Sequence, residues 1–415
     1  MEKKSAIYFK QYRIIIIERD MGLNICFVSP HIPPSFGGGG RRIYNIARFL
    51  AEQGHNINVI TSTKKPSNSL QNLNIDTVDI PGWYKKKHSN QLFSLLLKII
   101  WQPFIIYQLI KYISRNKSKV IHIVGSRSGI SFYTVLIAKI MGINVVNGTS
   151  GYGNDDPITI SKFNFGKLRK FVHFNLPDII LNNSPQLYKS CIDSKIKAEK
   201  VKMIPNPVNT ETYAPLDSRN GAADIKKSLN IPEDKTIFIN VSNITPSKNI
   251  EETIKLFSKY YNADKSAILL LVGKILDEEY YNDLKQILNK EKLDSSVRFT
   301  GRSNRVPELL KVSDCFIFTS KNEGMPNVVL EAMSSKLPII IKRIPNVTDY
   351  MFQFDNGYVY RTEQEGVSYI LNDFKDINKR TRIAKKARET ALKVFSYPVI
   401  IDQYLNLYKS VQHSD

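Results

Sequence analysis

The chain has 415 residues, of which 42% are hydrophobic and 23% charged, and its formal net charge is +21. This length suits two domains that each bury a core, and the sequence contains no Pro- or Gly-rich low-complexity tract and no tandem repeat. The positive charge favours anionic partners, such as nucleotide diphosphates, lipid pyrophosphates, phospholipid surfaces or nucleic acid, without choosing among them.

The three cysteines lie far apart in the sequence, at Cys26, Cys191 and Cys315. Two of them stand in apolar, strand-like runs, and none has the spacing of a metal ligand. We expect reduced core cysteines and a cytoplasmic chain. The six histidines are scattered as well, so we expect neither a metal site nor a cofactor.

Residues 1–20 contain only a four-residue isoleucine run between charged residues. Such a run is too short for the core of a signal peptide or for a membrane span. The first strand is expected at Leu23–Val28. We therefore interpret residues 1–20 as an extension upstream of a true start at Met21, with a basic N-terminal arm as the alternative.

From Met21 onward, strand-like and helix-like segments alternate, which is typical of a doubly wound α/β domain. A run of four glycines, residues 37–40, joins the first strand to the first helix. Such a loop lets the backbone come close to a diphosphate. The run lacks the GxGxxG order and the acidic residue of a dinucleotide site, which argues against an NAD enzyme.

The segment Tyr84–Lys119 has a mostly apolar centre with basic clusters at Lys85–Lys87 and Arg115–Lys119. Polar residues and Pro103 interrupt the centre, so it does not read as a transmembrane helix. Two interpretations remain open. One is a pair of helices packed on the sheet, and the other is an interfacial segment that docks on an anionic bilayer.

The most informative motif is Ser320–Pro338, which reads SKNEGMPNVVLEAMSSKLP. It places Glu323 in a loop and Glu331 in the helix that follows. Gly324 allows a ligand to approach the backbone, and Pro326 suits the start of a helix. Free N–H groups at such a helix start attract a phosphate, and the two carboxylates can accept hydrogen bonds from sugar hydroxyls.

The run from Glu323 to Met333 resembles the Glu-(seven residues)-Glu motif of family 4, the retaining nucleotide-sugar glycosyltransferases with a GT-B fold. The resemblance implies two doubly wound, Rossmann-like parallel-sheet domains that face each other across a cleft. Residues 21–205 would form the N-terminal, acceptor-side domain, joined by a C-terminal helix at 396–415. Residues 206–395 would form the domain that binds the donor.

The resemblance also assigns roles on the donor side. It implies that Glu323 meets the hydroxyls of the donor sugar and Glu331 those of the nucleotide ribose. The intervening residues of the donor loop are Gly324, Met325, Pro326 and Asn327.

Lys248 matches the family lysine that holds the donor diphosphate, and its charge would stabilise the leaving group. Asn243 stands where the family usually has an arginine, so this position carries no charge. Gly301 belongs to a loop expected near the nucleotide base.

On the opposite side, Gly38 and Gly39 are expected near the donor phosphates or the acceptor. Ser150 occupies a position where many relatives have a histidine that helps to position the donor sugar. Ser150 is a weaker candidate for this role than a histidine would be. The neighbouring pair Asp155 and Asp156 is interpreted as acceptor-side or structural.

The implied activity is a metal-independent hexosyl transfer from a UDP- or GDP-sugar to a hydroxyl, with retention. The acceptor is expected to be a glycan or a lipid-linked glycan of bacterial surface polysaccharide synthesis, reached from the inner face of the membrane. Two alternatives are a non-catalytic GT-B protein that binds nucleotide sugars and a GT-B epimerase. A nucleic-acid partner is not expected, because the chain lacks an aromatic-basic motif and a reading helix.

Overall fold

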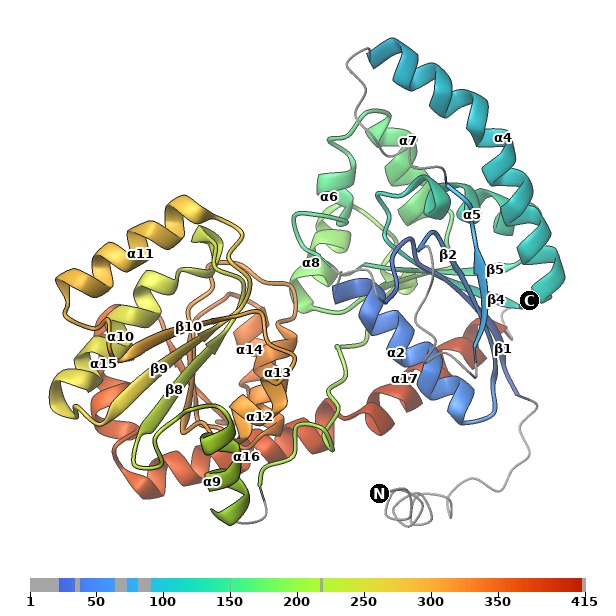
Figure 1. The fold of residues 1–415 in the computed structure, drawn as a ribbon. Coiled ribbons are helices and arrows are strands. Elements are labelled where there is room, and N and C mark those ends of the chain that lie inside the picture. The colour runs from blue at the N-terminus through green and yellow to red at the C-terminus, as the bar shows by residue number, and fades with distance from the viewer. Residues whose placement is uncertain are drawn as a thin grey trace.

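The computed structural model describes residues 22–33, 38–63, 73–80, 91–149, 151–216 and 219–412. They form two lobes, each built around a sheet with helices packed against it (Figure 1). Residues 1–20, Lys85–Lys87 and Ser150 lie outside the described residues.

The first lobe contains a seven-stranded sheet in the order β3-β2-β1-β4-β5-β6-β7. All neighbouring pairs are parallel. Its central strands are rich in buried Ile and Val, as expected for a sheet covered on both faces. The strands are β1 (Asn24–Val28), β2 (Asn56–Thr61), β3 (Asn74–Thr77), β4 (Val120–Val124), β5 (Asn144–Gly148), β6 (Ile179–Asn182) and β7 (Val201–Met203).

Several helices of this lobe begin where short polar side chains cap them. Ser128, Asp156 and Ser184 each accept hydrogen bonds from backbone N–H groups at such a start. The elements are α2 (Gly38–Glu52), α4 (Gln91–Asn116), α5 (Gly129–Ile140), α6 (Pro157–Ile160), α7 (Gly166–Lys170), η1 (Phe171–Asn175), α8 (Pro185–Asp193) and η2 (Ala198–Lys200).

The second lobe contains a six-stranded parallel sheet in the order β10-β9-β8-β11-β12-β13. Its strands are β8 (Thr236–Val241), β9 (Ala267–Val272), β10 (Val297–Gly301), β11 (Cys315–Phe318), β12 (Ile339–Lys342) and β13 (Tyr358–Tyr360). Its helical elements are α9 (Arg219–Ser228), η3 (Pro246–Lys248), α10 (Ile250–Ala263), α11 (Glu278–Lys290), α12 (Val306–Lys311), α13 (Asn327–Ser334), α14 (Val347–Met351), α15 (Glu363–Ser368), η4 (Tyr369–Asp373) and α16 (Ile377–Val394).

The chain passes between the lobes twice, and the two crossings are joined. The first follows β7, and the second leads from α16 into the last helix, α17 (Tyr397–Gln412). The N–H of Val208 donates to the carbonyl of Phe395 at 2.7 Å, and Val208 forms an isolated parallel bridge with Ser396. Helix α17 then packs into the core of the first lobe, as the red helix in Figure 1 shows.

The expected pair of parallel-sheet domains is confirmed, but two details differ from the sequence prediction. Residues Val201–Met203, near the end of the expected N-terminal domain, form a seventh strand paired with β6 that the sequence did not indicate. The apolar segment forms one helix, α4, although Pro103 lies inside it. A proline removes one helical hydrogen bond at a cost of about 3 kcal/mol. Burial of Ile105, Leu109 and Ile113 offsets that cost.

Helix α4 is also notable for what it exposes. Ile100, Phe104 and Tyr107 are 70%, 41% and 61% exposed, and their spacing puts them on one side of the helix. Within the described part of the chain, α4 and the other helices all fall short of the length and apolar character needed to cross a membrane.

Candidate functional site

The site lies at the carboxyl edge of the second sheet, where the strand order changes direction. β8 has β9 on one side and β11 on the other, and ligands of doubly wound folds bind at such a switch point. The loop after β11 leads into α13, whose cap position is Pro326. Because no side chain caps this eight-residue helix, its first N–H groups are available to a ligand.

Two loops meet at this edge and bring Lys248 to Glu323. The N–H of Lys321 donates to the carbonyl of Ser247 at 2.9 Å, and the hydroxyl of Thr319 donates to the carbonyl of Lys248 at 3.2 Å. These bonds fix the loops against each other. The Nζ of Lys248 lies 2.5 Å from Oε1 of Glu323, and both side chains are mostly buried. The sequence predicted both residues but not their ion pair.

Glu331 lies in α13 and is half-buried beside Tyr213 and Arg41. Burial raises the pKa of its carboxyl to about 7, against a hydrogen bond from Tyr213 and the charge of Arg41, which both lower it. Burial also raises the pKa of Tyr213. Because Arg41 comes from α2, the electrostatic environment of Glu331 includes a group from the other lobe.

Asn206 joins the two lobes through its side-chain amide. Its Oδ1 accepts hydrogen bonds from Arg42 at 2.9 Å and from Asn183 at 3.0 Å, both in the first lobe. Its Nδ2 donates to the carbonyl of Met325 at 3.3 Å and to Oδ1 of Asn327 at 2.7 Å, both in the second lobe. The donor loop is therefore attached to the first lobe through one buried amide.

Glycines 38–40 form the start of α2, the helix that carries Arg41 and Arg42. Gly38 and Gly39 lie in its first turn. A Cβ at Gly40 would overlap the carbonyl oxygen of His31, so this position has room only for glycine. Arg42 is 6% exposed, and its Nε has no hydrogen-bond partner.

Asn243 follows β8 and Gly301 is the last residue of β10, so both lie at the carboxyl edge of the sheet with β9 between their strands. Asn243 is exposed after β8. The carbonyl of Gly301 accepts from the N–H of Gly273 at 2.9 Å, and Gly301 has a φ of +68°, which glycine tolerates best. Gly273 itself packs so closely on the carbonyl of Ser242 that a Cβ would overlap it.

Most of the predicted site therefore comes together. Lys248 lies beside the donor loop and the helix that follows it, Asn243 and Gly301 lie at the same sheet edge on either side of β9, and Gly38 and Gly39 belong to the opposite lobe. The sequence did not indicate the residues from other parts of the chain that surround Glu331 and the donor loop, although two arginines directly after a glycine run were a usable signal. These residues are Arg41, Arg42, Asn183, Asn206 and Tyr213.

The pair Asp155 and Asp156 has a local structural role. Asp156 caps α6 and accepts from the N–H of Gly153 at 2.8 Å, and Asp155 accepts from the N–H of Gly151 at 2.8 Å. The part of the chain that the structure describes contains no group of His, Cys, Asp and Glu side chains suited to hold a metal ion.

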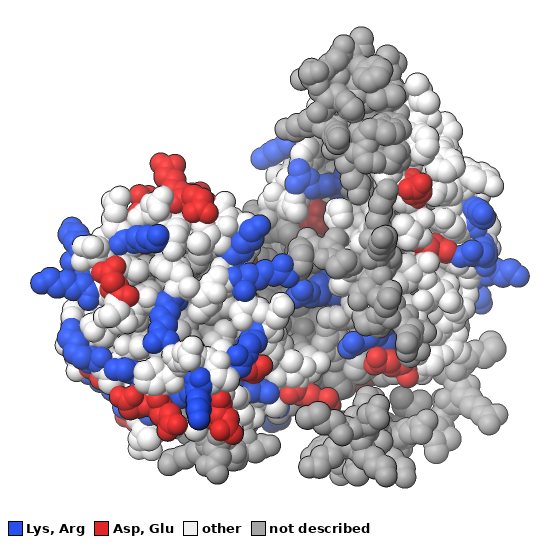
Figure 2. Space-filling view, viewed as in Figure 1, with Lys and Arg blue, Asp and Glu red and all other residues white. Residues whose placement is uncertain are grey.

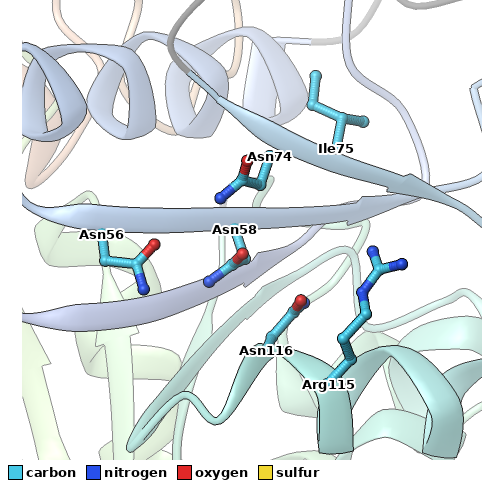
Figure 3. A pocket seen from close by; sticks show the side chains of 6 residues that line it. All are labelled: Asn56, Asn58, Asn74, Ile75, Arg115 and Asn116. Atoms are coloured by element: carbon cyan, nitrogen blue, oxygen red, sulfur yellow. The ribbon is translucent and has the colours of Figure 1, made fainter.

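A separate polar cavity of about 450 Å³ lies far from this site (Figure 3). Its walls include Asn56 and Asn74, which are the first residues of β2 and β3. The cavity therefore belongs to the amino edge of the first sheet, whereas the predicted site residues lie at carboxyl edges. Its lining residues are Asn56, Asn58, Asn74, Ile75, Arg115 and Asn116.

Comparison with known families agrees with this geometry. The family model "Glycosyltransferase Family 4" matches residues 36–212, and the model "Glycosyl transferases group 1" matches residues 222–390. The chain belongs to family 4 of the GT-B glycosyltransferases. The prediction of the family and of the fold class is thus confirmed.

Individual relatives extend the comparison. N-acetyl-alpha-D-glucosaminyl L-malate synthase of Bacillus anthracis is 24% identical over 401 residues, which cover 92% of this chain and 96% of that protein. UDP-Gal:alpha-D-GlcNAc-diphosphoundecaprenol alpha-1,3-galactosyltransferase of Escherichia coli is 29% identical over 224 residues, which cover 50% of this chain and 54% of that protein. Among solved structures, Anabaena HepE in complex with UDP has a TM-score of 0.74 at 19% identity, over 94% of this chain and all of that chain.

Proposed function

We propose that this glycosyltransferase transfers a sugar from a nucleoside diphosphate to a hydroxyl, with retention at the anomeric carbon and without a metal ion. The observation that carries the proposal is the ion pair between Lys248 and Glu323 beside the uncapped start of α13, with Glu331 in the same helix. This arrangement offers hydrogen-bond acceptors for sugar hydroxyls, a cation for phosphate and free N–H groups within one stretch of sheet edge.

Each group has a task in this proposal. Glu331 accepts hydrogen bonds from the ribose hydroxyls, and Glu323 accepts them from the donor sugar. When the donor binds, the ammonium of Lys248 contacts the diphosphate and gives up part of its contact with Glu323. As the bond to the sugar breaks, negative charge grows on the departing phosphate, and a fixed cation stabilises it. The departing phosphate takes the proton of the acceptor hydroxyl, and the acceptor attacks from the same face.

UDP is the proposed nucleotide, and GDP is the alternative. The support comes from similar proteins, because HepE was solved with UDP and the Escherichia coli relative is named for UDP-Gal. Thermal-shift measurements with UDP, GDP and ADP test this choice directly. A ligand at 100 times its dissociation constant adds about 2.7 kcal/mol of stability, so the preferred nucleotide should stand out.

For the acceptor we propose a lipid-linked glycan, used by a protein held peripherally on an anionic membrane at the cytoplasmic face. The exposed apolar side of α4 supports this, together with Lys111 and Arg115 on the same helix and the net charge of +21. The name of the Escherichia coli relative contains a lipid diphosphate. The free, buried cysteines suit a cytoplasmic location.

A small hydroxy acid is the second candidate acceptor. The specific observation is that the relative matched over 92% of this chain is named an L-malate synthase. Incubating the enzyme with UDP-sugars and either undecaprenyl-diphosphate glycans or malate separates the two. Product analysis in the same experiment tests the alternatives, since an epimerase changes the donor sugar without an acceptor. A non-catalytic protein binds the donor and turns over neither acceptor.

A further inference from the structure

The ion pair at the donor site of the second lobe leaves no net charge of its own for a diphosphate. Lys248 is paired with Glu323 at 2.5 Å, so the pair carries no net charge. Asn243, in the loop after β8, is neutral and exposed. A diphosphate that joins a ribose at Glu331 to a sugar at Glu323 would carry two negative charges through this region. A cation from the other lobe can add to the exposed lysines of this edge, Lys274 and Lys321, in balancing them.

The first turn of α2 is held against this region. Arg42 donates to Asn206, and Asn206 donates in turn to the donor loop at Asn327. Farther along α2, the ring of Phe49 stacks on Tyr397 at a centroid distance of 5.7 Å. These contacts fix the direction of α2. The N-terminus of α2, which is the positive end of its helix dipole, therefore lies at the donor site. The first turn of α2 contains no acidic residue.

Arg41 is the residue in this turn that is free to meet a ligand. Its side chain is exposed, unlike that of Arg42, which is buried and bonded to Asn206. Arg41 directly precedes Arg42, whose partner Asn206 bonds to Asn327 at the start of α13, so the turn that carries Arg41 lies beside the helix of Glu331, where the donor ribose is expected. The charge of Arg41 lowers the pKa of both Glu331 and Tyr213, which agrees with this position. The first phosphate of a nucleoside diphosphate is attached to that ribose.

We propose that Arg41 binds the donor diphosphate from the opposite lobe and supplies the charge that Asn243 lacks. The inference rests on the proposed function. Lys248 and Arg41 then lie at the two ends of the diphosphate, one from each lobe. A guanidinium can donate two hydrogen bonds to one phosphate, which favours arginine over lysine at this position. Figure 2 shows lysine and arginine side chains on both lobes beside the depression between them.

The experiment measures the affinities of uridine, UMP and UDP by competition or calorimetry for the full chain and for two single variants. Arg41→Gln should lower UDP affinity at least tenfold and leave uridine affinity unchanged. Arg48→Gln is the matched control, because Arg48 lies two turns along α2 and pairs with Glu52 at 3.5 Å. It should change UDP affinity less than twofold. Asn243→Arg in the Arg41→Gln background should restore most of the loss.

Several results would overturn the proposal. UDP affinity of Arg41→Gln within twofold of wild type would remove Arg41 from the phosphate site. An equal loss for uridine and UDP would show that Arg41 acts through Glu331 and the ribose. Failure of the wild type to bind UDP, GDP or ADP would instead contradict the proposed function itself, so the two failures are distinguishable.

Discussion

The ammonium of Lys248 lies 2.5 Å from the carboxylate of Glu323, across two loops of the second sheet that come from β8 and β11. The two groups expected to meet phosphate and sugar therefore hold each other in position. Both side chains are mostly buried, so removing one leaves the other charge without its partner. Such a truncation costs more than the pair itself contributes.

Lys248→Ala should lower kcat by about 10²–10³-fold with a smaller change in KM for the donor, because the charge on the phosphate grows in the transition state. Lys248→Arg should recover part of the loss. Steady-state kinetics with a saturating acceptor measure both constants. Lys321→Ala, which removes an exposed lysine of the loop that contains Glu323, is the control. An unchanged kcat for Lys248→Ala would exclude it from catalysis.

Glu331→Ala should weaken the binding of free UDP, whereas Glu323→Ala should leave UDP binding intact and reduce sugar transfer. Only Glu331 is placed to meet the part shared by donor and free nucleotide. Loss of a charged hydrogen-bond partner costs about 1.5–3 kcal/mol, which corresponds to roughly 10–150-fold in affinity. Titration calorimetry with UDP measures the difference. Equal affinities for the two variants would contradict these roles.

The raised pKa of Glu331 predicts how the free energy of unfolding changes with pH. Its carboxyl has an ordinary value of 4.5 and a pKa of about 7 in the folded protein. The stability from this group is therefore present below about pH 4.5 and lost as the pH rises through 7. Glu331→Gln should stabilise the protein at pH 8 by about 1–3 kcal/mol and have little effect at pH 5.

Urea unfolding at both pH values measures this difference, with the exposed Glu291 changed to Gln as the control. UDP binding by the wild type should weaken below pH 7, because a protonated carboxyl accepts fewer hydrogen bonds from the ribose. A stability difference independent of pH would show that Glu331 is not buried in its ionised form.

Asn206→Asp tests separately the hydrogen bonds that the side-chain amide of Asn206 accepts from the first lobe and those that it donates to the second. The carboxylate still accepts from Arg42 and Asn183, but it cannot donate to Met325 and Asn327. We expect kcat to fall about tenfold, as for the loss of two hydrogen bonds, and UDP affinity to change little. Asn209→Asp is the control, since Asn209 only accepts from the N–H groups of Glu211 and Thr212. A wild-type kcat for Asn206→Asp would exclude a positioning role.

The membrane proposal predicts that the protein sediments with anionic liposomes and not with neutral ones, and that added salt reduces the effect. Changing Ile100, Phe104 and Tyr107 to Ser should abolish sedimentation. Ile140→Ser is the control, because Ile140 is 85% exposed on a different helix. Trp101 lies beside the exposed face and should shift its fluorescence on contact. Equal sedimentation with and without anionic lipid would contradict the proposal.

Much of this architecture could be predicted because its signals are local. The strand expected at Leu23–Val28 and the helix expected after Pro326 follow from apolar runs and from the proline, and the structure has both. The donor residues lie within one motif, so their proximity in sequence carries over to space. Short edge strands were not predictable, since three-residue β7 and β13 form by pairing with their neighbours.

Contacts between the lobes could not be predicted for a related reason. Asn206 and Arg42 are 164 positions apart, and neither has a local pattern that indicates its partner. The ion pair of Lys248 and Glu323 depends on the order in which β8 and β11 lie side by side. Single-sequence reasoning identifies such residues one by one, whereas their pairing is a property of the topology.

The return of α17 makes the two halves of the chain inseparable. The family model of the second half ends at residue 390, yet Tyr404 and Tyr408 are completely buried in the first lobe, where Tyr408 contacts His122 at 2.7 Å. A fragment that stops at the linker would expose the surface that α17 covers in the core of the first lobe. Expression of either sequence half alone would therefore not reproduce the corresponding lobe. A circularly permuted protein would have to keep α17 packed on the first sheet.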